Sequence, residues 1–250
     1  LLTVHREVHF DERPVLVYAF SGFVDAGGGV RLAADHLLES CEHQLVASFD
    51  VDELLDYRAR RPRMSFVVDH FASVEVQQIV LHEVTDAAGH RFLLLTGPEP
   101  DYQWERVIEA VRELVVRLGI TLVVHTHGIP MAVPHTRPVG MTAHATDTSL
   151  IGDSISPFGR VQVPGSIGAL LEMRLGESGH QAVGFAIHVP HYLAGAEWAE
   201  GALAALNAVV DVTGLNLPND DLVLRARSNQ QAIAAEVEGG TWSGGRHTRP

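Results

Sequence analysis

Histidines are the side chains of this sequence best suited to metal or acid–base chemistry, because the 250-residue chain contains 15 of them. His125 ends the apolar run 120–125, and His127 follows it after one residue. Side chains two apart on a strand point to the same side, so both imidazoles can reach one zinc ion. Alternatively, the histidines are polar surface and loop groups, some of them buried and bonded to the backbone. We favour this second interpretation and expect no metal centre and no cofactor.

A run of three glycines, Gly27, Gly28 and Gly29, follows an apolar segment and precedes a helical pattern. Backbone N–H groups at the start of a helix can hold an anion. The dinucleotide-binding pattern G-x-G-x-x-G fails here, because its sixth position is Leu32, and the preceding Asp25 would repel a pyrophosphate. The alternative is a tight turn that only glycine can form.

The segment Gly152-Asp-Ser-Ile-Ser156 matches a block that carries the nucleophile in one class of serine hydrolases, with Ser154 in the place of the nucleophile. Such a serine needs a histidine that a carboxylate orients. That class places the two partners late in the chain as D-x-x-H, and no Asp stands three residues before any His after Ser154. We therefore expect no serine hydrolase and identify no catalytic residue.

Two loops follow the apolar runs 120–125 and 182–189 and carry the residues best suited to binding. The loop 128–146 holds Arg137, whose planar fork matches a carboxylate of a ligand or of the chain itself. Ligands of open α/β sheets bind beyond the carboxyl ends of the strands, where we expect this loop to meet the loop 188–193 and the glycine turn. The candidate pocket residues are Asp25, Gly27, Gly28, His127, His135, Arg137, His188, His191 and Tyr192.

The composition excludes several classes of protein. All 18 basic residues are arginines, so every chemistry that needs a lysine amine is excluded, including a Walker P-loop and a pyridoxal Schiff base. A formal charge of -13 opposes binding to nucleic acid or an anionic membrane. One cysteine, Cys41, permits no internal disulfide and suits a reducing compartment. No apolar run approaches the ~20 residues of a membrane span, and we expect a cytoplasmic protein.

The elements that must position these side chains alternate between strand and helix patterns, which predicts an α/β fold. We expect three layers, a central mostly parallel or mixed sheet with helices on both sides, and a helical C-terminal region. The helix after Asp101, which we expect as its cap, is the clearest, with apolar residues at i, i+3, i+4 and i+7 before Gly119. Strands are expected at 15–20, 44–49, 64–69, 75–84, 91–96, 120–125 and 182–189, and helices at 30–40, 101–118, 165–176, 196–212 and 219–238.

The expected domain organisation is an α/β core over residues 1–214, followed over 215–250 by a C-terminal helix and a flexible tail that is either complete or truncated. Two features interrupt the core. The segment 50–63 carries four arginines and four acidic residues, which favours an exposed excursion. A β-hairpin is expected over about 75–96, with its turn at Asp86-Ala-Ala-Gly-His90.

Four separated blocks together resemble the bacterial branch of the proteasome assembly chaperone 2 (PAC2-like) family. They are Ser21-Gly-Phe-Val-Asp-Ala-Gly27, Gly97-Pro-Glu-Pro-Asp-Tyr-Gln-Trp-Glu105, Gly128-Ile-Pro-Met-Ala-Val-Pro-His-Thr-Arg-Pro138 and His188-Val-Pro-His-Tyr-Leu193. The resemblance spans about 14–220. It implies a fold similar to the phosphorylase and nucleoside-hydrolase scaffold, a homo-oligomer, expected to be a trimer, and protein partners such as proteasome subunits. Archaeal and eukaryotic chaperones of this kind often have a C-terminal hydrophobic-Tyr-x tail. This sequence ends with His247-Thr-Arg-Pro250, so such a tail is either absent or cut off.

Our leading hypothesis is therefore a non-enzymatic, oligomeric protein that acts through protein–protein contact. The alternative is an enzyme or binder of a small nucleoside-like or anionic ligand, with Asp25 or His135 as acid or base and with Arg137 and the glycine N–H groups holding an anion. A third hypothesis is a scaffold whose 50–63 excursion carries the surface that a partner binds.

Overall fold

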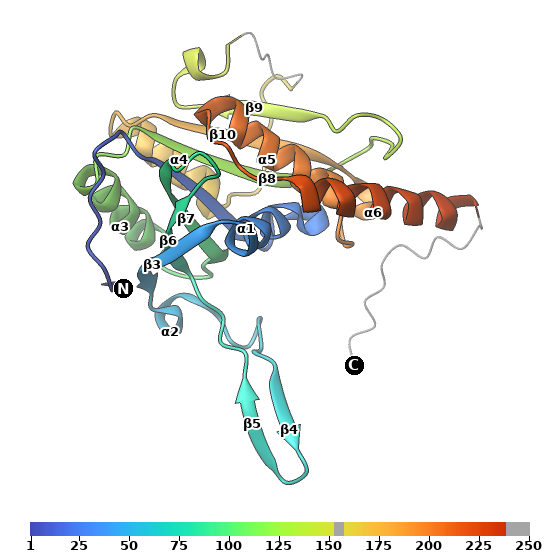
Figure 1. Ribbon diagram of the computed structural model, residues 1–250, viewed down its shortest axis with the longest axis horizontal. Helices are drawn as coiled ribbons and strands as arrows, with labels where there is room; N and C mark the ends of the chain where they lie inside the picture. The colour runs from blue at the N-terminus through green and yellow to red at the C-terminus, as the bar shows by residue number, and fades with distance from the viewer. Residues whose placement is uncertain (153–157, 239–250) are drawn as a thin grey trace.

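The structure is a computed structural model that describes residues 1–152 and 158–238 (Figure 1). Its helices are α1 Gly29–Ser40, α2 Val51–Leu54, α3 Trp104–Arg117, α4 Ile167–Glu177, α5 Ala199–Thr213 and α6 Asp220–Glu238. Its strands are β1 Leu2–Val4, β2 Val15–Ser21, β3 Glu42–Phe49, β4 Met64–Val67, β5 His70–Val74, β6 Val80–Thr85, β7 Arg91–Pro98, β8 Leu122–Met131, β9 Met141–Ala145 and β10 Ala182–Pro190.

Eight strands form one mixed sheet in the order β1-β3-β6-β7-β2-β8-β10-β9. The four central strands, β7, β2, β8 and β10, run parallel, and the outer pairs are antiparallel. The central strands are nearly continuous apolar runs because helices cover both of their faces. The predicted three-layer α/β fold with a helical C-terminal region is confirmed.

Helices cover both faces of the sheet, and each layer has its own core. On one face, α3 and α4 pack with Leu16, Leu95 and Val123. On the other, α1 and α5 pack with Val17 and Val124 (Figure 1). Alternate residues of one strand therefore belong to different cores, as the two-residue period of a strand requires. Helix α6 packs against α5, and Leu222 and Ala226 join the core on that face.

Two local expectations differ from the structure. The start of α3 is not capped by Asp101, because Gln103 occupies the capping position with a left-handed backbone (φ 59°). Asp101 instead pairs with Arg60 at 2.8 Å and accepts a hydrogen bond from the Asp56 N–H. The Asp101 carboxylate thus anchors the segment that contains Asp56 and Arg60 instead of capping α3. The helical pattern of the sequence does not reveal this role.

The excursion lies further along the chain than expected. Within 50–63, Leu54 and Leu55 are buried in the core, because the short helix α2 turns them inward. The part that leaves the body is the two-stranded hairpin of β4 and β5, which projects alone in Figure 1. The expected hairpin around Asp86 is present as β6 and β7, with the Asp86 N–H donating to the His90 carbonyl.

No helix in the described part of the chain is both long and apolar enough to cross a membrane.

Candidate functional site

The blocks beginning at Ser21, Gly97, Gly128 and His188 meet at the carboxyl ends of the parallel strands. The Gly128 N–H donates to the Val24 carbonyl at 2.8 Å, and a Cβ on Gly128 would collide with the Ala26 carbonyl. The block 97–105 joins them because the Glu99 N–H donates to the Ser21 carbonyl at 2.8 Å. Only glycine permits the two backbone segments, 24–26 and the one at Gly128, to approach so closely.

Asp25 and the glycine turn are brought together as predicted, but the Asp25 carboxylate is directed at the chain itself. It accepts hydrogen bonds from the N–H groups of Val30 at 2.8 Å and Arg31 at 3.4 Å, at the start of α1. Burial raises the pKa of Asp25, and these backbone bonds partly oppose the rise. Gly27 has φ 72° and packs against Val189 and Trp198. The N-terminus of α1 is therefore occupied by a carboxylate of the protein.

Glu99 performs the same task for α4, and sequence reasoning missed it. Its side chain is buried and accepts a hydrogen bond from the Ile167 N–H at 2.9 Å, in the first turn of that helix. Burial raises the pKa of Glu99, and the Ile167 bond and the positive charge of Arg60 oppose this. The Arg60 guanidinium also donates to the Glu99 carbonyl at 2.6 Å. Two helix starts at the carboxyl ends of the strands thus receive an acidic side chain, the half-buried Asp25 at α1 and the buried Glu99 at α4, where Ser166 is the capping residue.

The loop 132–140 holds two of the predicted residues in different ways. The His135 N–H donates to the Tyr192 hydroxyl at 2.9 Å, and its ring Nδ1 lies 2.8 Å from the same oxygen. The loops 128–138 and 188–193 therefore touch, as predicted. Arg137 is exposed and has no ion pair within the described residues, so the proposed internal pair is not formed there. His191 is exposed beside the Tyr192 ring.

His188 lies on β10, where its Nε2 is 2.8 Å from the Thr142 hydroxyl of β9. Burial lowers its pKa. Its ring also lies against the Gly140 backbone and near the Phe158 ring. His188 therefore joins the edge strand β9 to the sheet and belongs to a different contact from that of His135 and Tyr192.

His127 is the predicted residue with the densest polar surroundings. The rings of His125 and His127 point to the α4 side of β8, as the strand period predicts, and are stacked with centroids 5.4 Å apart. His144 of β9 lies 5.3 Å from the His127 ring. Glu172 of α4 accepts from His125 Nε2 and His144 Nδ1, both at 2.9 Å. We call these four residues the imidazole cluster.

The signal for Glu172 was present in the sequence. It falls in the buried stripe of α4, four residues after Gly168 and three before Leu175. A carboxylate in such a stripe requires a partner, because burying an unpaired charge is costly. Tyr18, stacked on His125 at 4.6 Å, gave no signal, because a tyrosine in a buried strand resembles any core aromatic. The match around Ser154 lies outside the described residues.

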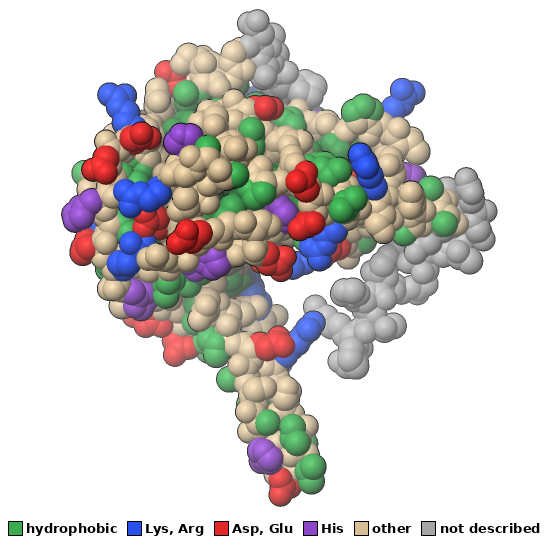
Figure 2. Space-filling model, in the orientation of Figure 1, with side chains coloured by type: hydrophobic (Ala, Val, Ile, Leu, Met, Phe, Trp, Pro, Cys, Tyr) green, Lys and Arg blue, Asp and Glu red, His purple; other side chains and the backbone are tan. Residues whose placement is uncertain are grey.

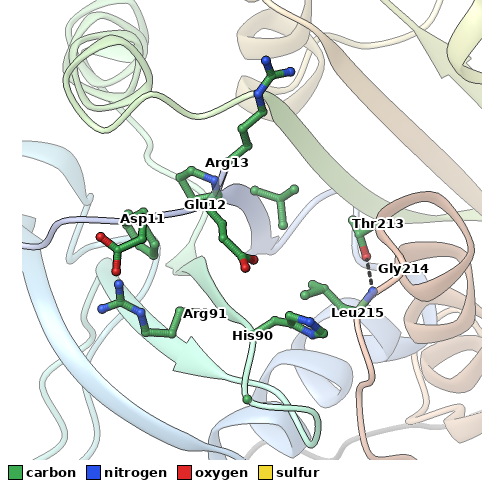
Figure 3. A pocket seen from close by; sticks show the side chains of 12 residues that line it. Asp11, Glu12, Arg13, His90, Arg91, Thr213, Gly214 and Leu215 are labelled. Carbon is green, nitrogen blue, oxygen red and sulfur yellow. Dashed lines mark hydrogen bonds between the residues drawn. The ribbon is translucent and has the colours of Figure 1, made fainter.

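A cavity lies at the amino ends of the parallel strands β2 and β7, opposite the carboxyl ends described above. It has a volume of about 380 Å³ and is bordered by the segment 10–15, the β6–β7 turn and the end of α5. Figure 3 shows that Asp11 and Arg91 point toward one another across it. Arg91 already binds Glu83 at 2.7 Å and the His9 carbonyl at 2.6 Å, so it fastens the N-terminal segment to the sheet. None of the predicted pocket residues borders this cavity.

A comparison with protein-family models matches residues 19–237 to the PAC2 family. The chain belongs to the PAC2 family. The four blocks at the strand ends lie within this match and account for the resemblance on which the prediction rested. No curated protein matches the sequence.

Solved structures of similar proteins have the same fold. Rv2714 of Mycobacterium tuberculosis, described as of unknown function, is 44% identical with a TM-score of 0.91 over 95% of this chain and 85% of its own. A Corynebacterium glutamicum protein of unknown function is 34% identical with a TM-score of 0.90, covering 95% and 90%. Rv2125 of Mycobacterium tuberculosis, called a proteasome-assembly chaperone homologue, is 24% identical with a TM-score of 0.83, covering 89% and 95%.

Proposed function

We propose that this PAC2 protein is a non-enzymatic, homo-oligomeric binding protein of the cytoplasm whose partners are proteins of the proteasome-assembly type. The observation that carries the proposal is the β4–β5 hairpin. Its apolar side chains are exposed, with 59% of Phe66, 66% of Phe71 and 91% of Val68 accessible. Figure 2 shows hydrophobic side chains at the projecting hairpin. Contiguous exposed apolar groups typically mark a protein contact.

The hairpin requires a partner for a second physical reason. A two-stranded hairpin is at best marginally stable in water by itself. The edge-to-face contact of Phe66 and Phe71, with centroids 5.2 Å apart, orders the two strands but leaves the outer ring faces in solvent. A protein groove that covers both rings would add the free energy of burying them, ~1.5–3 kcal/mol for a fully buried side chain.

The charge beside the hairpin favours a particular partner surface. Arg58, Arg61 and Arg63 are exposed at its base, whereas the whole chain has a formal charge of -13. We propose that the partner offers an apolar groove with an acidic rim, which would meet the phenylalanines and the arginines together. The similarity to Rv2125, a proteasome-assembly chaperone homologue, supports a proteasome subunit as this partner.

The occupied helix starts also support binding over catalysis. An anionic substrate at the strand ends would compete with Asp25 for α1 and with Glu99 for α4. The imidazole cluster includes a carboxylate but, within the described residues, the hydrogen bonds of Glu172 join two histidines rather than a histidine and a serine. These contacts support an architectural role for the strand ends.

The test compares the double variant Phe66→Ser/Phe71→Ser with wild type in binding to purified proteasome subunits of the source organism. The affinity is expected to fall about 10- to 100-fold, the equivalent of the lost apolar burial. Val116→Ser is the matched control, because Val116 is 60% exposed on α3, away from the hairpin. It should bind like wild type.

The oligomeric state of the same variants shows whether the hairpin binds a different protein or a second copy of this chain. Light scattering should give a trimer for wild type and for the double variant. Dissociation of the double variant into monomers would mean that the hairpin binds a second copy of this chain, and equal subunit binding by all variants would exclude the hairpin as the partner surface. Either result contradicts the proposal.

Exposed Arg137 favours a second candidate function, the binding of a small anion, because its guanidinium has no ion pair within the described residues. Inorganic phosphate should then raise the Tm of wild type but not of Arg137→Gln. No phosphate-dependent shift in wild type would contradict this function.

A further inference from the structure

The imidazole cluster is assembled from three neighbouring strands at one level of the sheet. On β10, Gly184 pairs with His125 of β8 on one side and with His144 of β9 on the other. His127 follows His125 on the same face. One ring nitrogen from each of the three histidines lies within 4.8 Å of the others. Strand register thus gathers the three imidazoles, and no local sequence motif does so.

Gly184 makes this gathering possible. A Cβ at this position would overlap His144 Cε1 and His125 Nε2 and would lie 2.8 Å from Glu172 Oε2. The absence of a side chain on the middle strand leaves a cradle that the two imidazoles and the carboxylate share. The requirement is steric, because Gly184 is not among the glycines with positive φ.

Glu172 supplies the negative charge of the cluster. Its carboxylate oxygens accept hydrogen bonds from His125 Nε2 and His144 Nδ1, both at 2.9 Å. In the described part of the chain, the carboxylate is paired with imidazoles rather than with an arginine.

His127 shows that the cluster is incomplete. Its Nδ1 is buried and has no hydrogen-bond partner among the described residues. The ring lies 5.4 Å from that of His125 and 5.3 Å from that of His144, centroid to centroid. An unsatisfied buried polar group is destabilising, whereas a neutral imidazole is the form that binds a metal ion.

We propose that His125, His127, His144 and Glu172 bind one zinc-class divalent metal ion. Three imidazole nitrogens and one carboxylate oxygen complete a tetrahedral set of the kind that zinc prefers, with bonds of ~2.0–2.2 Å. Such bonds place ligand atoms ~3.3 Å apart. Glu172 Oε2 lies 2.9 Å from His125 Nε2 and Glu172 Oε1 lies 2.9 Å from His144 Nδ1, so either oxygen already has nearly this spacing from one imidazole and must approach the other two by side-chain rotation. The widest nitrogen separation must close by ~1.5 Å, which side-chain rotation can supply.

The ion would act as a cross-link. It would join the central strand β8, the edge strand β9 and the helix α4, which come from three separate parts of the sequence. A site with four protein ligands is closed and structural, because no position remains for a substrate. This role is independent of the proposed partner binding, since the hairpin and the cluster share no residue.

The experiment starts from full-length protein stripped with a chelator and freed of it by dialysis. Calorimetric titration with Zn²⁺ should give one ion per chain, and saturating Zn²⁺ at about 100 times Kd should raise the Tm by ~5–10 °C. Titration with Co²⁺ should give the strong visible absorption of a tetrahedral site. A folded wild-type chain that binds less than half an equivalent of Zn²⁺ would overturn the proposal.

Variants assign the ion to the cluster rather than to surface histidines. His144→Ala should weaken Zn²⁺ binding at least ~100-fold, and Glu172→Gln at least ~10-fold. His9→Ala, which removes an exposed ring outside the cluster, should bind like wild type. Equal affinity of His144→Ala and wild type, or a comparable loss in His9→Ala, would contradict the proposed ligands.

A glycine variant tests the cradle without removing any ligand. Gly184→Ala should lose Zn²⁺ binding and the tetrahedral Co²⁺ spectrum, because its methyl group displaces both imidazoles. Gly195→Ala is the matched control, since no atom of the described residues lies within 4 Å of a Cβ there. If His144→Ala does not fold, the comparison of Gly184→Ala with Gly195→Ala decides the question, and unchanged binding in Gly184→Ala contradicts the site.

Discussion

The Asp86 carboxylate accepts hydrogen bonds from backbone N–H groups on both sides of a chain crossing. It bonds Ala88 at 2.9 Å and His90 at 2.8 Å within the β6–β7 turn, and Asn216 at 2.7 Å after α5. Burial raises its pKa, but the bonds from Asn216, His90 and Ala88 outweigh this and lower it overall. One side chain thus fastens the turn to the segment that leads into α6.

Replacing Asp86 should therefore change both stability and its dependence on pH. Asp86→Asn keeps one acceptor and loses the other, so the free energy of unfolding at pH 7 should fall by ~1–3 kcal/mol. Because the folded pKa is lowered, the contribution of Asp86 is present above the unfolded pKa, ~3.9, and disappears as the pH falls through the folded value. Urea unfolding at pH 7 and pH 3 measures this.

The variant should thus lose less stability than wild type between the two pH values. Asp211→Asn, at an exposed position of α5, is the control and should follow wild type. A difference between Asp86→Asn and wild type that does not narrow at pH 3 would mean that the carboxylate charge is not what holds the turn.

Single residues also show how far sequence reasoning reaches. His125 and His127 were expected to share a face, because the period of a strand is local. The contribution of His144 depends on the pairing of β9 with β10, which is set by contacts far apart in sequence. Asp25 was correctly placed at the glycine turn, but its carboxylate faces the start of α1. This orientation could not be predicted, because no sequence pattern distinguishes a capping carboxylate from one directed at a ligand.

At the scale of elements, the cap of α1 gives a sharp test. Asp25→Ala removes the acceptor for the Val30 and Arg31 N–H groups, and the free energy of unfolding should fall by ~0.5–2 kcal/mol. Asp25→Asn retains an acceptor and avoids burying a charge, so its stability should lie within ~0.5 kcal/mol of wild type. Chemical denaturation of the three proteins gives the comparison. Equal stability of Asp25→Ala and wild type would refute the capping role.

The elements that sequence predicted best are those with one continuous physical cause. The parallel strands are apolar on both faces, and α3 has a regular apolar stripe, so both were placed within a few residues. The prediction of one continuous loop over 128–146 was wrong, since β8 continues to Met131 and β9 begins at Met141. Their polar residues reflect the imidazole cluster and the sheet edge, and polar strands are hard to distinguish from loops by hydrophobic pattern.

The exposed excursion was predicted at the wrong place in the chain, again because the hydrophobic pattern does not show where a segment lies. Charge density over 50–63 suggested exposure, whereas the buried Leu54 and Leu55 anchor that segment to the core. The apolar residues of 64–69 predicted a strand, and β4 is that strand, yet β4 and β5 are exposed throughout. A hydrophobic segment is expected to be buried, but the sequence of one chain does not specify whether it is buried in its own core or in an interface with a partner.

At the scale of the whole molecule, the hairpin and the body should behave as separate units of stability. In Figure 1 the hairpin projects away from the layered body, and its base is closed by one backbone bond from the Glu75 N–H to the Arg63 carbonyl at 2.9 Å. Because Arg63 and Glu75 are already adjacent, two glycines can replace residues 64–74 without strain. The Tm of this shortened protein should lie within ~2 °C of wild type, since no core residue is removed.

Calorimetry of the shortened protein measures that Tm. The same sample tests whether partner binding and metal binding belong to separate parts of the molecule. Partner binding should be lost, because the exposed phenylalanines are gone, whereas Zn²⁺ binding at the imidazole cluster should be unchanged. A fall in Tm of more than ~5 °C would mean that the hairpin packs on the body of this or a neighbouring chain. The hairpin would then support the fold itself, and its exposed apolar surface would require a structural explanation in place of a binding one.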